Sequence, residues 1–477
     1  MRYIPHTDAD VAQMLRIIGA SSVEELFSHI PAQLRLKKPL DIEALDEVSL
    51  MTHLGQLGAR STPAAGATVR EGAALSFLGA GLIPHHVPVA VDMMLQRAEW
   101  YTSYTPYQPE VAQGTLQAVF EYQTLVSELF GPSVTPGQAA PYVSNASMYD
   151  GASATAEAVL MARRITGRSA VVACGAIHPQ YLGTLHCYLD GIDSEGRGAI
   201  KTVGFGADGR VDLTALATLL AELGSTVACV LVQSPNYLGV LQDVSAVRAL
   251  AQKAGALTVV ACPEPLAFGL VKSPGSQGAD IVAGEGIGLA SGPSLGGPGV
   301  GLFAARSEHV RQIPGRLVGE TVDQDGRRGY VLTLATREQH IRREKATSNI
   351  CTNQGLIALA FAIHLCMLGK SGFRRLAELN LAKSEYLKQR LLGVRGFRLA
   401  VSGPTFNEIA VTVRGRAADV ALRLREQGIF AGVPLDQPGF ELPSLPDAER
   451  TLLIATTERH RREDIDHLVT ALDEVCP

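Results

Sequence analysis

The sequence predicts an α/β protein built on a mostly parallel sheet with helices on both faces, and two observations support this. Short apolar runs recur in the middle of the chain, at residues 170–173, 227–232, 257–261, 281–283 and 300–304. Runs of this length without alternating polar residues are typical of strands that are buried on both faces. Residues 211–223 and 244–254 lie between such runs and have the apolar periodicity of amphipathic helices. Strands that alternate with helices indicate parallel crossover connections.

The two ends of the chain predict separate parts. Residues 7–30 have the pattern of two short amphipathic helices interrupted at Gly19. After Tyr330 we expect a long helical region to about residue 368. Further elements follow it: strands at 397–401, 409–413 and 452–455, and helices at 417–427 and 462–475. We therefore expect three parts: an N-terminal helical arm (1–60), a large α/β domain (61–329), and a linker helix with a small α+β domain (330–477).

Composition excludes several functional classes. The chain has 477 residues and a formal net charge of −5, whereas a nucleic-acid-binding protein needs a basic face. Its seven cysteines, with no C-x-x-C pair, indicate a reducing compartment and not a disulfide framework. The N-terminus lacks the apolar run of a signal peptide, and the longest apolar stretch, 356–368, is too short to span a bilayer. We expect a soluble, cytoplasmic protein that binds neither nucleic acid nor membrane.

A glycine-rich stretch, residues 284–301, separates the last two apolar runs of the predicted sheet. Glycine tolerates positive φ and has no side chain, so such a loop allows backbone to approach a ligand closely. The stretch contains no lysine, histidine or cysteine, and its one carboxylate is Glu285. It has the character of an active-site loop that lacks its reactive group.

Three familiar motifs fail on their context. Residues 292–296 match the G-x-S-x-G string, but that motif needs a helix after the serine and here a strand follows. The glycines at 284, 286 and 288 resemble a dinucleotide fingerprint with its third glycine misplaced. Residues 369–371 end like a phosphate-binding loop, yet His364 stands where the first glycine belongs. We reject all three.

Two polar segments are candidates for a ligand site. In residues 104–110, two prolines hold the chain extended and would aim Tyr104, Tyr107, Gln108 and Glu110 at one place. A stiff surface turn explains the same residues. Residues 145–154 lead into a predicted helix at 155–164, whose free N–H groups suit either a phosphate or ordinary helix capping.

The adjacent histidines at 85 and 86 lie in a proline-flanked segment. Histidines are common metal ligands. Neighbours in sequence rarely point the same way, however, so we expect a loop role and no metal site.

These segments together resemble the glycine dehydrogenase (decarboxylating) family, the P-protein of the glycine cleavage system. The resemblance covers nearly the whole chain and rests on several long motifs: residues 5–7, 104–110 with 113–114, 145–152, 233–239, 314–319 and 336–354. It implies the aspartate-aminotransferase-like fold, fold type I of the pyridoxal-phosphate-dependent transferases.

The same resemblance places the coenzyme's lysine at a position where this chain has none. Pyridoxal phosphate is held as a Schiff base on a lysine. In the family's active subunit that lysine precedes a turn ending in Gly-Gly-Pro-Gly, and counting back from residues 296–299 puts it near Ile287. No lysine occurs between Lys272 and Lys345, and neither of these matches the position. We therefore expect no catalytic residue and no covalently bound coenzyme in this chain.

A second departure concerns the carboxylate that would pair with the coenzyme's ring. Glu264 follows the strand at 257–261, where the active subunit has an aspartate, and its role is left open. The resemblance indicates a vestigial site made of Asn145, Ser147, Glu264, Gly296 and Gly297. Two departures at two expected places favour subunit 1, the lysine-free alpha subunit of a two-chain P-protein.

The resemblance further implies the reaction and the partners. A lysine-bearing subunit 2 would carry pyridoxal phosphate and decarboxylate glycine, in a heterodimer or heterotetramer with this chain. The aminomethyl group would pass to the lipoyl group of the H-protein. Tyr104, Tyr107, Gln108 and Glu110 are the candidates for an active-site wall supplied by this chain. Residues 337–345 could dock the acidic carrier, although a salt-bridged helix explains their charges as well.

Two other functions remain open. The chain could be a self-sufficient pyridoxal-phosphate enzyme with an atypical lysine. It could also be a non-catalytic scaffold or binding homologue, in which residues 284–301 are a relic loop. A nicotinamide dehydrogenase is disfavoured because the dinucleotide fingerprint fails.

Overall fold

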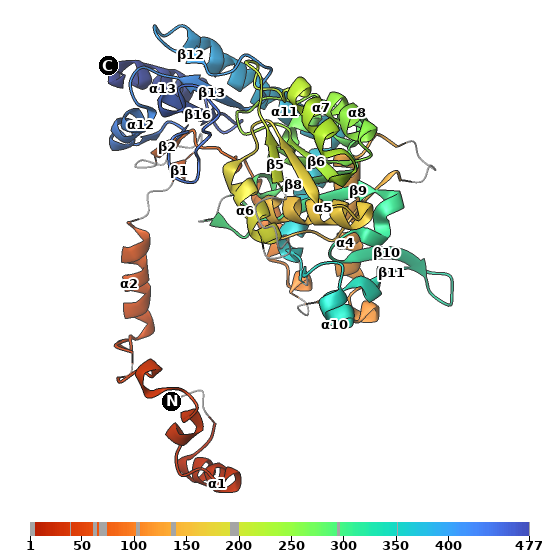
Figure 1. Ribbon diagram of the computed structural model, residues 1–477. Coiled ribbons are helices and arrows are strands. Elements are labelled where there is room, and N and C mark those ends of the chain that lie inside the picture. Colours follow the sequence, from red (N-terminus) through yellow and green to blue (C-terminus); the bar gives the residue numbers. More distant parts are fainter. Residues whose placement is uncertain are drawn as a thin grey trace. The chain divides into compact units, whose positions relative to one another are not determined.

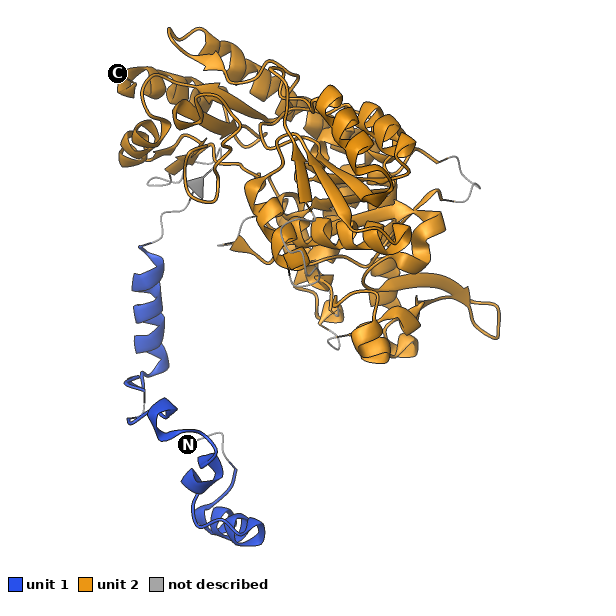
Figure 2. Ribbon diagram, viewed as in Figure 1, with its two compact units in different colours: residues 1–62 blue, residues 63–477 orange. Residues whose placement is uncertain are grey.

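The computed structural model (Figure 1) describes residues 5–38, 40–60, 64–65, 74–101, 105–134, 140–190, 200–292, 296–350 and 352–476. It divides the chain into two compact units, Met1–Thr62 and Pro63–Pro477 (Figure 2).

The first unit consists of short helices: α1 (Asp8–Ile18), η1 (Glu24–Phe27), η2 (Ala32–Leu34) and α2 (Glu47–Gly58). Thr7 caps the start of α1 in a reciprocal pair with Asp10, and Gly19 ends it with a φ of +75°. The predicted interruption at Gly19 is confirmed. No residue of these four helices is buried, and apolar side chains such as Ile17 and Met51 are exposed. The described part of this unit therefore has no core of its own.

The main sheet of the second unit has seven strands, in the order β3-β9-β8-β7-β6-β4-β5. Their bounds are β3 (Tyr142–Ser144), β4 (Ala170–Cys174), β5 (Ile200–Val203), β6 (Val227–Gln233), β7 (Leu257–Cys262), β8 (Ile281–Glu285) and β9 (Gly301–Arg306). Strands β4 to β8 run parallel, and β9 is antiparallel to its neighbours β8 and β3. The mostly parallel sheet is confirmed, with five of its strands at the predicted apolar runs.

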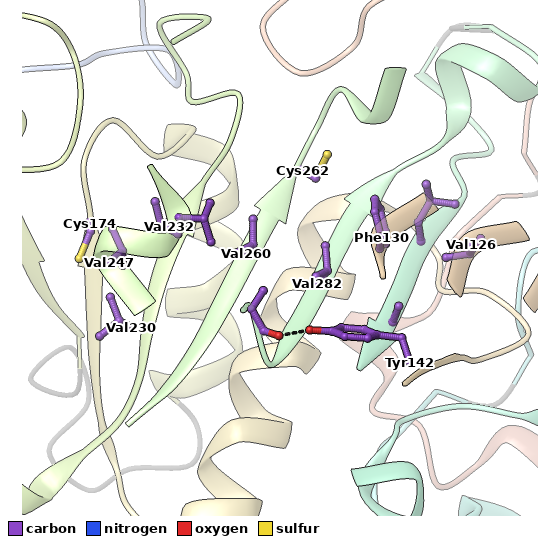
Figure 3. Close-up of a cluster of buried hydrophobic side chains, with 14 of the residues drawn as sticks. Val126, Phe130, Tyr142, Cys174, Val230, Val232, Val247, Val260, Cys262 and Val282 are labelled. Atoms are coloured by element: carbon purple, nitrogen blue, oxygen red, sulfur yellow. Dashed lines mark hydrogen bonds between the residues drawn. The ribbon is translucent and has the colours of Figure 1, made fainter. Parts of the chain in front are cut away.

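Helices cover both faces of this sheet. One face packs against α4 (Gln113–Phe130), α7 (Leu213–Leu223), α8 (Val244–Lys253) and α11 (Gly355–Leu392), and the other against α5 (Gly151–Thr166) and α6 (Pro179–Asp190). Along β6, Val230 and Val232 belong to the first core, whereas Cys229 and Leu231 belong to the second. Figure 3 shows part of the first core, in which Val230, Val260 and Val282 come from adjacent strands. A strand with a core on each face has no polar side, which explains the continuous apolar runs.

The prediction of a continuous helical region from Tyr330 is wrong for the residues before Gly355. Strands β10 (Leu317–Val322) and β11 (Arg328–Thr333) form an antiparallel hairpin there, and short turns fill the chain to Lys345: η11 (Ala335–Arg337), α10 (Gln339–Arg342) and η12 (Arg343–Lys345). Pairing with residues 317–322 outweighs the local pattern, and Arg343, with a φ of +52°, ends the helical turn before it. The long helix α11 begins only at Gly355.

Within the described residues, α11 has the length and apolar composition to cross a membrane. The core helix of a soluble protein can have the same length and composition. The backbone of α11 is not helical at Gly369, and Ala358, Phe361 and Leu365 are buried in the first core. His364 donates a hydrogen bond through Nδ1 to the carbonyl of Leu289, at 2.7 Å. These contacts are those of a core helix.

The C-terminal part holds a four-stranded antiparallel sheet in the order β12-β13-β16-β15, made of β12 (Arg398–Leu399), β13 (Glu408–Thr412), β16 (Thr451–Ala455) and β15 (Val433–Pro434). Helices α12 (Ala417–Glu426) and α13 (Arg462–Val475) pack on it. A small parallel sheet joins β2 (Ala74–Ser76) to β14 (Ile429–Phe430) and to β1 (Ala64–Ala65). A domain boundary near residue 330 stays a prediction.

The segment after β2 enters the C-terminal part and meets a buried carboxyl group. Ala80 donates its N–H to Oε1 of Glu408 at 2.7 Å, and a Cβ on Gly79 would lie 2.3 Å from the same oxygen. Burial raises the pKa of Glu408 to about 7, and the charge of Glu264 acts in the same direction. The protonated form is therefore favoured in the fold.

This raised pKa predicts a pH dependence of stability. The contribution of Glu408 is fully present below its ordinary pKa of 4.5 and is lost as the pH rises through about 7. Glu408→Gln keeps an acceptor for Ala80 and cannot ionise. Relative to the parent, the variant should gain about 2 kcal/mol of unfolding free energy between about pH 5 and pH 8, since one pKa unit corresponds to about 1.4 kcal/mol.

Urea unfolding at the two pH values measures the difference. Glu426→Gln, at an exposed position of α12, is the matched control and should show the same stability difference from the parent at both. A Glu408→Gln difference that does not change with pH would contradict the assignment of a neutral carboxyl.

Candidate functional site

The carboxyl ends of the parallel strands lie at one edge of the main sheet, next to the C-terminal part. In open α/β sheets, ligands bind outside these ends. The residues that follow β4, β7 and β8 here include His178, Glu264 and Ile287. This edge is therefore the place where the resemblance puts the coenzyme.

An imidazole ring lies between two carboxylates at this edge. Nε2 of His85 is 3.1 Å from Oε2 of Glu264, and Nδ1 is 2.9 Å from Oε2 of Glu458. The three side chains are 1%, 5% and 9% exposed. Burial by itself would lower the pKa of His85, but the two carboxylates, Glu264 first, outweigh it and raise the pKa to about 10. His85 is thus an imidazolium at neutral pH and donates from both nitrogens.

The two carboxylates are held by further donors. Glu264 accepts from Nδ2 of Asn407 at 3.1 Å and from the N–H of Leu266 at 3.0 Å. Glu458 accepts from the N–H of His86 and from Nδ2 of Asn380 at 2.9 Å. Burial would raise the pKa of Glu458, but hydrogen bonding to His85 and its positive charge lower it to about 2. Every member of this ion cluster is therefore paired, as buried charges require.

The position predicted for the lysine is packed tightly. Ile287 is buried at the start of the one-turn helix α9 (Ile287–Ala290). A Cβ on the next residue, Gly288, would lie 2.4 Å from the carbonyl oxygen of Ile83, so the segment before His85 lies directly against α9.

Little space remains between these groups. Among the described residues, the cavity beside Ile287 has a volume of about 10 Å³ and is lined by Gly81, Ile83, His85, Pro263, Glu264, Pro265, Glu285, Ile287, Gly288 and Leu289. A single water needs about 10 to 15 Å³. The residues present therefore do not fit pyridoxal phosphate.

The start of α5 is also occupied by side chains of the chain itself. Oε2 of Glu285 accepts from the N–H of Gly151 at 2.8 Å. Oδ1 of Asp150 accepts from the N–H groups of Ala152 and Ser153, at 2.8 and 2.9 Å. Of the two interpretations of residues 145–154, these bonds match helix capping and leave the first three N–H groups without capacity for a phosphate.

Glu285 has two further donors. Its Oε1 accepts from the N–H groups of Ile287 at 2.8 Å and Val300 at 3.1 Å. Burial raises the pKa of Glu285 to about 7, while its three backbone donors act in the opposite direction. The one carboxylate of the glycine-rich stretch thus joins β8, β9 and α5.

The five residues predicted for a vestigial site lie in different places. Glu264 lines the small cavity. Asn145 donates through Nδ2 to the carbonyl of Pro314 at 3.0 Å, and Ser147 accepts through Oγ from the N–H of Gln354 at 3.1 Å. Gly296 and Gly297 have φ values of +106° and +157° and follow residues 293–295, which lie outside the described residues.

Of the four residues predicted for an active-site wall, Tyr104 lies outside the described residues, and Tyr107, Gln108 and Glu110 lie within them. Tyr107 is 52% exposed, and its hydroxyl accepts from Nη2 of Arg316 at 3.1 Å. Arg316 is buried and also lies 5.3 Å from the centre of the Tyr107 ring. Gln108 and Glu110 are exposed beside it. Tyr107 is therefore an exposed aromatic ring with a fixed hydroxyl.

Arg316 is itself held by two other side chains. Its Nε donates to Glu338 and its Nη1 to Oγ1 of Thr105, both at 3.3 Å. The ring of His340 packs edge-on against Tyr107, with 5.5 Å between the ring centres. The polar cluster thus joins the 105–110 segment to the 336–354 motif.

The sequence identifies Glu264 as a site residue but not its two partners in the ion cluster, His85 and Glu458. His85 was considered only as a metal ligand; among the described residues, no group of three or more His, Cys, Asp and Glu side chains is suited to hold a metal ion. Its partner Glu458 lies 373 positions away, and no local spacing can connect them. His178 was also missed. It donates through Nε2 to the carbonyl of Ala80 at 2.8 Å, and burial lowers its pKa to about 4.

Comparisons with known proteins show the family of the chain. The family model for the glycine cleavage system P-protein matches residues 1–472. A probable glycine dehydrogenase (decarboxylating) subunit 1 from Sorangium cellulosum is 50% identical, with full coverage of both chains. A protein of the same description from Rhodospirillum rubrum is 48% identical, again with full coverage of both.

Solved structures give the same result for the fold. The crystal structure of glycine decarboxylase (P-protein) of the glycine cleavage system, in inhibitor-bound form, is 42% identical with a TM-score of 0.82, and the match covers all of both chains. A sphingosine-1-phosphate lyase from Burkholderia pseudomallei is 15% identical with a TM-score of 0.63 over 93% of each chain, which shows a common fold alone. The fold is fold type I of the pyridoxal-phosphate-dependent enzymes. The chain belongs to the glycine cleavage system P-protein family, among the relatives that form subunit 1 of glycine dehydrogenase (decarboxylating).

Proposed function

We propose that this subunit acts by completing the active site of a lysine-bearing partner, and that it carries no coenzyme itself. The observation that supports this most directly is the closed cavity of about 10 Å³ beside Ile287, at the position of the expected lysine. Pyridoxal phosphate, bound to the partner, supplies the electron sink for loss of carbon dioxide from glycine. The aminomethyl group then passes to the lipoyl group of the H-protein. The complex is cytoplasmic and is a heterodimer or heterotetramer.

This chain contributes positioning to the reaction. The hydroxyl of Tyr107 is held by the buried Arg316, while half of its side chain stays exposed to a partner. Gln108 and Glu110 are exposed on the same rigid segment. A phenol held by Arg316, with an exposed amide and an exposed carboxylate beside it, can orient a small polar substrate and exclude water from it.

Reconstitution tests the division of labour. The purified chain with pyridoxal phosphate should show no Schiff-base absorption band that borohydride removes, and no exchange of bicarbonate with the carboxyl group of glycine. Mixing it with its lysine-bearing homologue should restore the exchange. A band and exchange from the chain alone would establish the self-sufficient enzyme. Full activity of the homologue alone would establish a non-catalytic scaffold.

The wall role predicts a loss of rate without a loss of assembly. In the proposed wall the hydroxyl of Tyr107 makes one hydrogen bond to the substrate. Such a bond is worth about 1 kcal/mol, so Tyr107→Phe should lower glycine decarboxylation by the reconstituted complex about fivefold. Glu110→Gln should also lower the rate, whereas Glu121→Gln, an exposed carboxylate on α4, should not.

Size-exclusion chromatography checks that each variant still elutes with its partner. Tyr386→Phe is the control for the phenol, because Tyr386 binds Asp466 in the C-terminal part. Unchanged kinetics for both Tyr107→Phe and Glu110→Gln would reject the wall.

A further inference from the structure

Two polar arrangements line the cavity of about 10 Å³ beside Ile287, and each has the chemistry of one end of pyridoxal phosphate. We propose that this chain carries internal substitutes for the coenzyme: the His85 imidazolium takes the place of the protonated ring nitrogen beside Glu264, and the Glu285 carboxyl group, as a hydrogen-bond acceptor, takes the place of the phosphate oxygens at the start of α5. The inference concerns this chain alone and does not depend on the partner's active site.

The ring side rests on Glu264. A carboxylate at this edge of the sheet pairs with the protonated ring nitrogen of the coenzyme. Here Oε2 of Glu264 lies 3.1 Å from Nε2 of His85, a flat, positively charged ring with an N–H donor. A buried carboxylate without a cation would be strongly destabilising, so the loss of the coenzyme requires a replacement charge. His85 supplies it.

The phosphate side rests on Gly151. The first N–H groups of a helix and its dipole favour an anion. Oε2 of Glu285 lies 2.8 Å from the N–H of Gly151. A Cβ on Gly151 would lie 2.9 Å from Cβ of Glu285 and 2.2 Å from the hydroxyl of Tyr181, so the carboxylate stem occupies the space directly above the helix start. A phosphate and this side chain cannot be present together.

The substitution has a mechanical consequence. His85 connects Glu264 of the large sheet to Glu458, which follows β16 of the C-terminal part. Asn407, which precedes β13, donates to the same Glu264. Side chains of this chain thus connect the large sheet to the C-terminal part at this junction.

Ring probes test the first substitution. His85→Gly in the full-length chain leaves a ring-sized cavity between two carboxylates. At about pH 6, imidazole and pyridine should raise the thermal midpoint of the variant at concentrations at least about tenfold below those at which pyrazole, a neutral ring of similar size, has the same effect. His364→Gly is the matched control, because His364 is equally buried and bonds only the carbonyl of Leu289. There, pyrazole should act at least as well as imidazole.

A charge cycle keeps the test decisive if His85→Gly does not fold. His85→Gln leaves Glu264 and Glu458 facing each other without a cation. Adding Glu458→Gln to His85→Gln should therefore raise the urea midpoint, whereas Glu458→Gln alone should lower it. If Glu458→Gln changes the urea midpoint by the same amount in the parent and in His85→Gln, the ionic role of His85 is overturned.

Inorganic phosphate tests the second substitution. Glu285→Ala combined with Asp150→Ala frees the first three N–H groups of α5. Phosphate should therefore raise the thermal midpoint of this double variant and leave the parent unchanged. Equal response of the two proteins would overturn the phosphate substitution. Stabilisation of His85→Gly by all three rings at the same concentration would overturn the ring substitution. Because both measurements use the isolated chain, their failure is distinct from a failure of the reconstituted complex.

Discussion

The imidazolium of His85 between Glu264 and Glu458 is the interaction on which the arrangement of the site depends. It brings together three segments that are remote in sequence: the chain after β2, the end of β7 and the end of β16. Each charge is almost fully buried, so none can lose its partners without a large desolvation penalty. The position of the segment before His85 agrees with this constraint. Its residue Ile83 lies directly against Gly288, and His85 then reaches both carboxylates.

In this fold, the edge at the carboxyl ends of the strands can either bind a ligand or be packed with side chains. The strands β4 to β8 deliver their carboxyl ends to one place, as in any sheet of this class. In this chain the place is filled by Ile83, His85 and Ile287 instead of a ligand. Fold and site are thus separable. The proposed function rests on the 105–110 segment, where the hydroxyl of the exposed Tyr107 accepts from Arg316.

Much of the fold could be predicted because a strand that is buried on both faces has a continuous run of apolar residues. The strands β4, β6 and β7 have such runs, and the helices α7 and α8 have the apolar periodicity of amphipathic helices. The hairpin strand β11 has none, since its pairing with β10 decides its structure and residues 328–333 carry mixed side chains. The absence of a lysine near Ile287 could be predicted because the family resemblance places that lysine a known number of residues before the Gly-Gly-Pro-Gly turn at 296–299.

The rest of the site could not be read from the sequence. Whether a histidine is ionised depends on groups that only the tertiary fold brings within 3.1 Å. The occupation of the α5 start by Glu285 likewise needs contact between residues 134 positions apart. Residues 145–154 looked equally like a cap and an anion site, because both use the same N–H groups.

The protonation state of His85 is the most direct test of this account. Nitrogen-15 chemical shifts of its ring, in the histidine-labelled chain and assigned with His85→Gln, report whether both nitrogens carry protons. At about pH 8, well above the ordinary pKa of histidine, the account predicts an imidazolium at His85 and a neutral ring at His178. A neutral His85 under these conditions would contradict the claim that a fixed cation closes the site.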